Sequence, residues 1–177
     1  EDVERVGKLC GMFPGLTNFL LQHQLTGKLF KSASGIHADR RIPEFPRENF
    51  PQWAKKRNLK TQPGKRLNRK VAYFAGCTAN YLFPDVPKAV VEVFQHNGFE
   101  VYYPEQKCCG MPMMSNGDME GARKNFNKIV QSLFHMASPD LDIITTCPSC
   151  NFMLKKEALP FFDSEEARFV SSRISDA

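Results

Sequence analysis

The chain has 177 residues, 42% hydrophobic and 24% charged, values that are ordinary for a globular protein with a substantial core. It has no apolar run near the ~20 residues that a membrane-spanning helix needs, and its first residues, E-D-V-E-R-V, lack the layout of a signal peptide. These features argue against an integral membrane protein and a secreted one, and we expect a soluble, cytoplasmic chain.

The charge is unevenly distributed along the chain. Residues 1–70 carry fifteen Lys and Arg against six Asp and Glu, whereas residues 71–177 carry nine against thirteen. A basic segment can bind nucleic acid, a membrane surface or an acidic partner. Because no nucleic-acid-binding motif accompanies the basic residues, we expect no nucleic-acid partner and interpret the segment as a solvated connection.

The N-terminal part predicts helical and extended structure without strands. Residues 13–31, F-P-G-L-T-N-F-L-L-Q-H-Q-L-T-G-K-L-F-K, carry an uneven apolar stripe that predicts one helix packed on a neighbour. Residues 40–53 contain three prolines and predict an extended arm. The stretch K-T-Q-P-G-K-R, residues 60–66, is typical of a linker.

From residue 70 onwards, short apolar runs alternate with amphipathic stretches. The apolar runs predict buried strands over 71–77, 99–104 and 141–147, and the amphipathic stretches predict helices over 84–98, 116–136 and 148–159. The apolar stripe of the first helix comprises Val86, Ala89, Val90, Val93 and Phe94. The stripe of the second comprises Ala122, Phe126, Ile129, Val130 and Leu133.

Strands and helices in this alternation imply parallel strands joined by right-handed crossovers. The expected fold class is therefore α/β: a small parallel sheet flanked by helices, with a helical and extended N-terminal arm. We divide the chain into a basic connecting segment (1–66), a cysteine-rich domain (67–162) and the start of a C-terminal linker (163–177).

Five of the six cysteines follow predicted strands. Cys77 ends the first strand, Cys108 and Cys109 follow the second, and Cys147 ends the third with Cys150 just beyond it. The carboxyl ends of parallel strands lie at one edge of a sheet, where ligands gather. In a chain without a secretion signal, cysteines gathered in this way indicate a metal or redox site more than disulfides.

Two of these cysteines are neighbours in sequence. Adjacent side chains can serve one site only where the backbone bends, and Gly110 would permit such a bend. A zinc ion takes four ligands, so five thiolates leave one over. An iron–sulfur cluster offers several anchor points, and soft thiolates suit either metal. The number of thiols therefore favours an iron–sulfur cluster, with zinc as the alternative.

The residues around the thiols suit anionic ligands. Cys150 falls in the first turn of a predicted helix, where free N–H groups and the helix dipole stabilise a thiolate. Gly76 and Gly110 leave room for backbone N–H groups to approach sulfur, and Lys107 either balances charge nearby or faces solvent. Cys10 stands apart and is not counted as a ligand. No paired carboxylates, Ser/His/Asp arrangement or phosphate-binding glycine pattern indicates a hydrolytic or nucleotide site.

The motifs F-A-G-C, K-C-C-G-M-P and C-P-S-C resemble the cysteine-rich CCG domain of heterodisulfide reductase-type proteins. The stretches F-A-G-C-T-A-N-Y-L-F-P, C-C-G-M-P-M-M-S-N-G and D-R-R-I-P-E-F resemble in particular the iron–sulfur subunit of anaerobic glycerol-3-phosphate dehydrogenases. The resemblance covers most of residues 37–160. It implies that a [4Fe–4S] cluster of the non-cubane kind is bound by Cys77, Cys108, Cys109, Cys147 and Cys150. Such subunits also have a ferredoxin-like domain and a second CCG domain, so we expect a piece of a longer protein.

The resemblance also implies a function. The chain would be an electron-transfer module of a membrane-associated dehydrogenase complex, cytoplasmic or peripheral on the inner face of the membrane, and not catalytic alone. It would relay electrons from a flavin-containing dehydrogenase subunit, beside a ferredoxin-like cluster domain, towards quinone. Two alternatives stay open: a catalytic heterodisulfide reductase-like cluster domain, and a structural zinc-binding interaction domain in which one cysteine is spare.

Overall fold

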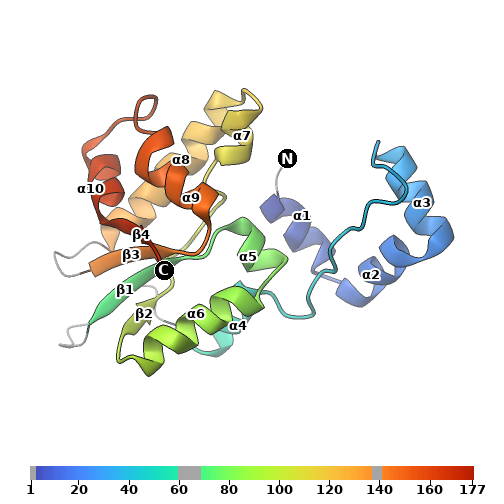
Figure 1. The fold of residues 1–177 in the computed structure, drawn as a ribbon, viewed down its shortest axis with the longest axis horizontal. Helices are drawn as coiled ribbons and strands as arrows, with labels where there is room; N and C mark the ends of the chain where they lie inside the picture. Colours follow the sequence, from blue (N-terminus) through green and yellow to red (C-terminus); the bar gives the residue numbers. More distant parts are fainter. Residues whose placement is uncertain (1–2, 60–68, 137–140) are drawn as a thin grey trace.

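The computed structural model describes residues 3–59, 69–136 and 141–177, and a parallel four-stranded sheet forms its centre (Figure 1). The strand order is β2-β1-β3-β4. The strands are β1 (Lys70–Phe74), β2 (Glu100–Tyr102), β3 (Leu141–Thr145) and β4 (Ile174–Asp176). The expected α/β class is confirmed, and the three predicted strands are all present. The linker expected at residues 60–66 lies outside the described residues.

The register of the central strands determines where the chain leaves the sheet. β1 pairs with β3 over its full length, with Lys70 level with Leu141 and Phe74 level with Thr145. β2 pairs with the other side of β1 in the same direction. The three strands therefore point their carboxyl ends to one edge, and the segments that follow them start side by side.

Both faces of the sheet are covered by helices, which explains why the strands are rich in apolar residues on both faces. Successive side chains of a strand point to opposite faces, so Ala72 and Phe74 enter one core while Val71 and Tyr73 enter the other. Figure 1 shows one face under α4 (Phe50–Lys56) and α6 (Asp85–His96). The opposite face is covered by α7 (Met111–Ser115), α8 (Met119–His135), α9 (Pro148–Phe152), the π-helix η1 (Met153–Glu157) and α10 (Glu165–Arg173).

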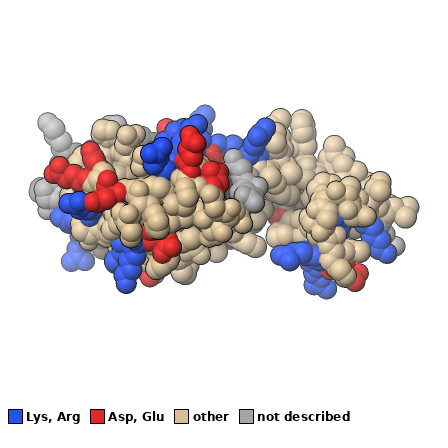
Figure 2. All heavy atoms as spheres, turned by 90° about the horizontal axis from the view of Figure 1, so that it is seen from above, with Lys and Arg blue, Asp and Glu red and all other residues tan. Residues whose placement is uncertain are grey.

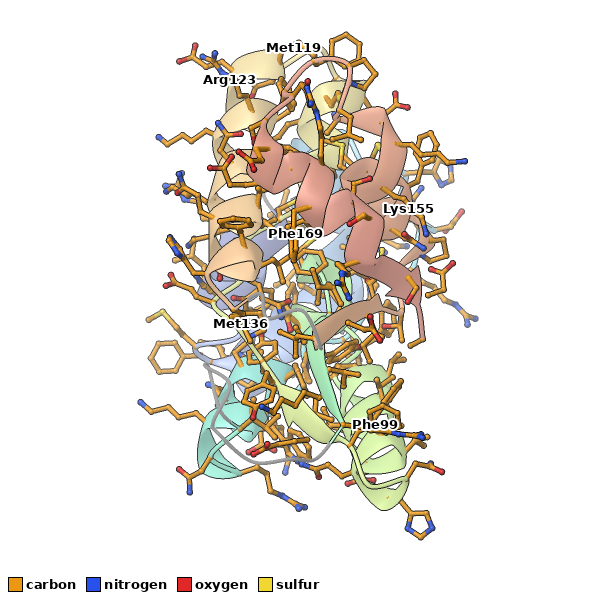
Figure 3. All side chains as sticks on the ribbon, turned by 90° about the vertical axis from the view of Figure 1, so that its left-hand side faces the viewer. Phe99, Met119, Arg123, Met136, Lys155 and Phe169 are labelled. Atoms are coloured by element: carbon orange, nitrogen blue, oxygen red, sulfur yellow. The ribbon has the colours of Figure 1, made fainter. Side chains whose placement is uncertain are left out.

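The two long crossover helices differ in how well their buried faces could be predicted. In α8, which Figure 3 shows extending from Met119 towards Met136, all five residues of the predicted stripe are buried. In α6 the predicted face was partly wrong. Val90 and Phe94 pack against the core as predicted, but the buried residues are Pro87 and Val91, whereas Val86 is 49% exposed and Val93 58% exposed. Valines occur on several sides of this helix, so the apolar pattern alone could not single out the buried face.

The C-terminal residues extend the sheet. Residues 163–177 were expected to start a linker, but α10 and β4 pack on the domain, and Val170 and Ile174 are buried in the core. Ser164 caps α10 by accepting a hydrogen bond from the backbone N–H of Ala167. The predicted helix over 148–159 is α9 continued by η1, from which Lys155 donates to the carbonyl oxygen of Ile174 at 3.0 Å (Figure 3).

The N-terminal segment is mostly helical, with more helices than predicted. It contains α1 (Val3–Cys10), α2 (Pro14–Gln22) and α3 (Gln24–Ala33). The single helix predicted over 13–31 is broken at His23, whose backbone is extended. The extended arm was predicted over residues 40–53, and residues 40–49 indeed contain neither helix nor strand, but residues 50–53 form the first part of α4. Asn18 holds the arm through two hydrogen bonds of 2.8 Å to the backbone of Phe45.

Helices α2 and α3 project from the body of the molecule (Figure 1). No residue of α2 is buried, and Phe13, Leu16 and Phe19 are 60–66% exposed. Figure 2 shows this end of the molecule as mostly uncharged, with Lys and Arg gathered on one side. No helix among the described residues combines the length and apolarity needed to cross a bilayer.

Candidate functional site

The five cysteines that follow the strands lie at one edge of the sheet, as the topology predicts. Cys77 begins α5 (Cys77–Tyr81) three residues after β1. Cys108 and Cys109 lie in the loop between β2 and α7. Cys147 is the N-cap of α9, and Cys150 lies within that helix. Three chain segments that are distant in sequence therefore deliver their thiols to the same place.

All five thiols line a single cavity of about 400 Å³. Its walls are otherwise mostly apolar, and they include Phe83 and Val86 on one side and Met111 and Pro112 on another. Cys108, Cys109 and Cys150 are at most 3% exposed. The cavity is thus an apolar chamber in which the sulfur atoms are the main chemically reactive groups.

Gly76 lets the segments of Cys77 and Cys150 approach one another. Its φ is +79° and its ψ is 164°, a combination that is essentially restricted to glycine. A Cβ atom at this position would lie 3.0 Å from the sulfur of Cys150 and 3.7 Å from the Cβ of Cys147. The absence of a side chain here therefore creates part of the space between the thiols.

Gly110 explains how the adjacent cysteines serve one site. Its backbone is left-handed, with φ of +92°, and a Cβ atom here would lie 2.9 Å from the carbonyl oxygen of Ala122. This turn lets the loop bend directly after Cys109. The sulfur of Cys108 lies 3.8 Å from that of Cys77, while the thiol of Cys109 interacts with that of Cys150.

The five thiols form one hydrogen-bonded network with an uneven distribution of protons. Hydrogen bonds from Cys109 and Cys77, together with the backbone N–H of Gly110, lower the pKa of Cys108 to about 3 against the effect of burial. A hydrogen bond from Cys150 and the backbone N–H groups of α9 lower the pKa of Cys147 to about 6. Both shifts favour the thiolate form of these two sulfurs.

The other three thiols have raised pKa values, which favour their protonated form. Donation to Cys108 and burial raise the pKa of Cys77, and donation to Cys108 raises the pKa of Cys109 to about 12. Donation to both Cys109 and Cys147, with burial, raises the pKa of Cys150. A metal group that binds all five sulfurs would replace these shared protons.

These residues fit a thiolate-bound metal group with several binding points. The donor set consists only of soft sulfur atoms, the rest of the cavity lining is mostly apolar, and Gly76 leaves the space that a side chain would fill. Within the described parts of the chain, no three His, Cys, Asp and Glu side chains are gathered in a way that would hold a single metal ion. Cys10, at the end of α1, does not line the cavity.

Gln106 is a site residue that the sequence did not reveal. Its side-chain amide donates to the carbonyl oxygen of Tyr73 at 2.6 Å and accepts from the backbone N–H of Ala75 at 3.0 Å. It therefore ties the end of β1, which leads to Cys77, to the loop that leads to Cys108. No pattern in the sequence signals this role, because both partners are backbone groups about thirty residues away.

Glu4 is a second residue that the sequence did not reveal. Lys107, expected either to balance charge or to face solvent, is 35% exposed at its side chain and forms an ion pair of 3.0 Å with Glu4 of α1. Burial would raise the pKa of Glu4, but hydrogen bonds from Lys8 and Lys107 outweigh that effect and lower it. The carboxylate thus joins the N-terminal helix to the residue before Cys108.

Comparison with known proteins identifies the cysteine-rich part. Residues 71–155 match the model of a family described as a cysteine-rich domain, CCG. The chain is 33% identical over 124 residues to a fumarate reductase (CoM/CoB) subunit of Methanothermobacter marburgensis, covering 64% of this chain and 23% of that protein. It is 27% identical over 154 residues to an anaerobic glycerol-3-phosphate dehydrogenase subunit of Escherichia coli K12, covering 86% of this chain and 38% of that protein.

A third relative matches a shorter stretch of the chain. Lactate utilization protein A of an Exiguobacterium species is 36% identical over 86 residues, which cover 48% of this chain and 34% of that protein. The chain therefore spans well under half the length of these relatives. No solved structure matches the chain.

Proposed function

We propose that the chain, whose residues 71–155 match the model of the CCG cysteine-rich domain family, is an iron–sulfur electron-transfer module of a membrane-associated dehydrogenase complex. The observation that carries the proposal is the convergence of five thiols on one cavity, since five soft ligands exceed what one zinc ion binds and suit a group with several irons. The names of two relatives, subunits of a dehydrogenase and of a reductase, support a role within a larger complex.

The proposed group is a [4Fe–4S] cluster of the non-cubane kind. The residues that would hold it are the five cavity thiols, Cys77, Cys108, Cys109, Cys147 and Cys150. When bound, such a group takes up and releases electrons, and its reduction potential depends on hydrogen bonds to sulfur and on exposure to solvent. The chain controls both quantities, because N–H groups at the starts of α7 and α9 point towards Cys108 and Cys147 and apolar residues wall the cavity.

The names of two relatives describe subunits of larger enzymes, which supports partner subunits for this chain. We propose a flavin-containing dehydrogenase subunit as the electron donor, a ferredoxin-like cluster domain beside this one, and quinone as the final acceptor.

The exposed apolar side chains of α1–α3, with Lys8, Lys28 and Lys31, support a peripheral position on the inner face of the membrane. Sedimentation with anionic vesicles, but not with neutral ones, is the expected result, and no sedimentation with either contradicts this position.

The cofactor is tested by measuring iron, acid-labile sulfide and zinc in protein prepared without oxygen. We expect iron and sulfide in similar amounts and a paramagnetic signal in one redox state. Each Cys→Ser substitution in the cavity should lower the iron content, whereas Cys10→Ser should leave it unchanged, because Cys10 lies outside the cavity.

Two results contradict the proposal. Zinc as the only metal, bound stoichiometrically under iron-replete conditions, indicates a structural zinc domain, and one of the five cavity substitutions should then leave the metal content intact. Turnover of a disulfide by this chain with an artificial electron donor indicates a heterodisulfide reductase-like catalyst instead of a relay.

A further inference from the structure

Helix α1 contacts two of the three segments that deliver thiols to the cavity. Its Gly7 lies against Tyr81 in α5, the helix that Cys77 begins, and a Cβ atom on Gly7 would lie 2.5 Å from the Cβ of Tyr81. The two helices can pack this closely only because residue 7 has no side chain. One side of α1 is therefore fitted to the Cys77 segment.

The second contact of α1 is electrostatic. One carboxylate oxygen of Glu4 accepts from Lys107 at 3.0 Å and from Lys8 at 2.6 Å. Glu4 is only 8% exposed, unlike the carboxylates of surface ion pairs. Separation of Lys107 from Glu4 would leave the carboxylate with Lys8 as its remaining cation in a poorly solvated place, so the pair with Lys107 is costly to break. The pair therefore fixes α1 to the residue that precedes Cys108.

We propose that Glu4 is a positioning residue of the thiol site: through Lys107 it holds the segment before Cys108, and it offsets the positive charge of Lys107, the residue that precedes Cys108 in the chain. This inference rests on the proposed function insofar as the charge acts on a bound cluster. Its structural part, the fixing of the segment, concerns the protein with or without a cluster.

The charge effect of Glu4 can be distinguished from its positioning effect by the sign of the shift in reduction potential. Reduction adds negative charge to the site, and a nearby cation stabilises the reduced form. With Glu4 in place, the charge of Lys107 is partly neutralised. Glu4→Gln leaves the lysine charge uncompensated and should shift the reduction potential to more positive values. Lys107→Gln removes the cation and should shift the potential to more negative values.

The mobility of the segment should change in the same direction in both variants, unlike the reduction potential. Both substitutions remove the same charge-assisted hydrogen bond, so both should loosen residues 105–109 in the same direction. Amide hydrogen exchange in this segment should become about tenfold faster or more in each variant. A general loosening of the site cannot shift the potential in opposite directions in the two variants, so the pair of readouts distinguishes charge from structure.

The experiment compares Glu4→Gln, Lys107→Gln and the double variant with Glu48→Gln as the matched control. Glu48 also pairs with a lysine, Lys56, but neither residue lines the thiol cavity, so the Glu48→Gln variant should leave both readouts unchanged. Gly7→Ala tests the positioning role of α1 without changing a charge, because the added Cβ forces α1 away from Tyr81. It should accelerate exchange in residues 105–109 and shift the potential in the direction of Glu4→Gln.

The positioning role, the charge effect and the proposed function are each contradicted by a different result. Unchanged exchange in residues 105–109 of both Glu4→Gln and Gly7→Ala overturns the positioning role. Faster exchange with potential shifts of the same sign in Glu4→Gln and Lys107→Gln overturns the charge effect. Protein that contains no iron contradicts the proposed function, and exchange measured on that same protein still decides whether Glu4 positions the segment.

Discussion

The dimensions of the thiol cavity depend on individual residues that carry no thiol. Gly76 leaves the space next to Cys150, and Gly110 turns the chain directly after Cys109. Gln106 then joins the segments that lead to Cys77 and Cys108. The cysteines supply the chemistry of the site, whereas these neighbours determine the separations between the sulfur atoms.

Gly76→Ala should impair both folding and metal binding. The backbone conformation of Gly76 costs a residue with a side chain about 1–3 kcal/mol, and the new methyl group would crowd the sulfur of Cys150. Gly98→Ala is the matched control, since Gly98 has the same φ of +79° but no atom within 4 Å of an added Cβ. Urea unfolding should show a loss of stability in both variants, and only Gly76→Ala should lose most of its iron. Equal iron contents would contradict this account.

Gln106→Leu should destabilise the protein although it replaces a polar residue by an apolar one. The substitution leaves the carbonyl of Tyr73 and the N–H of Ala75 without the partner that Gln106 provides, which costs about 1–3 kcal/mol each when the group stays dry. Denaturant unfolding monitored by circular dichroism measures the change. Gln95→Leu, at an exposed position of α6, should stay within about 0.5 kcal/mol of the parent protein; a similar loss there would point to a general effect of the leucine.

At the scale of elements, the parts of the fold that follow from local patterns could be predicted. Continuous apolar runs identified β1, β2 and β3, and a regular stripe identified the buried face of α8. The parallel topology expected from these strands was sufficient to predict that all five thiols lie at one edge of the sheet. In α6 the pattern was ambiguous because its valines surround the helix, and burial depended on how the helix packs against α4.

The features that could not be predicted depend on contacts between distant residues. β4 has three residues, and it is a strand because it pairs with β3. Glu4 is one acidic residue among several in the N-terminal segment, and only the fold brings it to Lys107, 103 positions along the chain. The same holds for Gln106, whose partners are backbone groups. Such contacts leave no periodic signal in the sequence.

Ile174→Ala tests whether the C-terminal segment is part of the folded domain. Ile174 is 1% exposed in the core beneath α8 and α10, and truncation of a buried isoleucine costs about 2–5 kcal/mol. A segment that merely connected two domains would tolerate the change. Thermal or urea unfolding gives the measurement, and Ser175→Ala, at the exposed neighbouring position of β4, is the control. A change below about 0.5 kcal/mol for Ile174→Ala would contradict the packing of β4.

At the scale of the whole molecule, the thiol cavity is the point where three crossover connections meet. The segments after β1, β2 and β3 belong to opposite faces of the sheet, and α1 joins them from outside through Glu4 and Gly7. A group bound to all five sulfurs would therefore link parts of the chain that otherwise separate on unfolding. Its effect on stability should exceed that of any single contact in the site.

Removal of the bound metal should consequently destabilise the entire domain. A ligand that binds only the folded state at a thousand times its dissociation constant adds about 4 kcal/mol to the free energy of unfolding. For a chain of this size each kcal/mol shifts Tm by about 2–4 °C, so protein stripped with a chelator under reducing conditions should unfold about 8–16 °C below the loaded protein. Calorimetry measures this difference, and amide exchange should accelerate together in the loops that hold Cys77, Cys108 and Cys147.

Cys10→Ser should preserve the full difference in Tm between loaded and stripped protein, because Cys10 lies outside the cavity. Acceleration confined to one loop would mean that the metal binds that segment alone and does not connect the three crossovers.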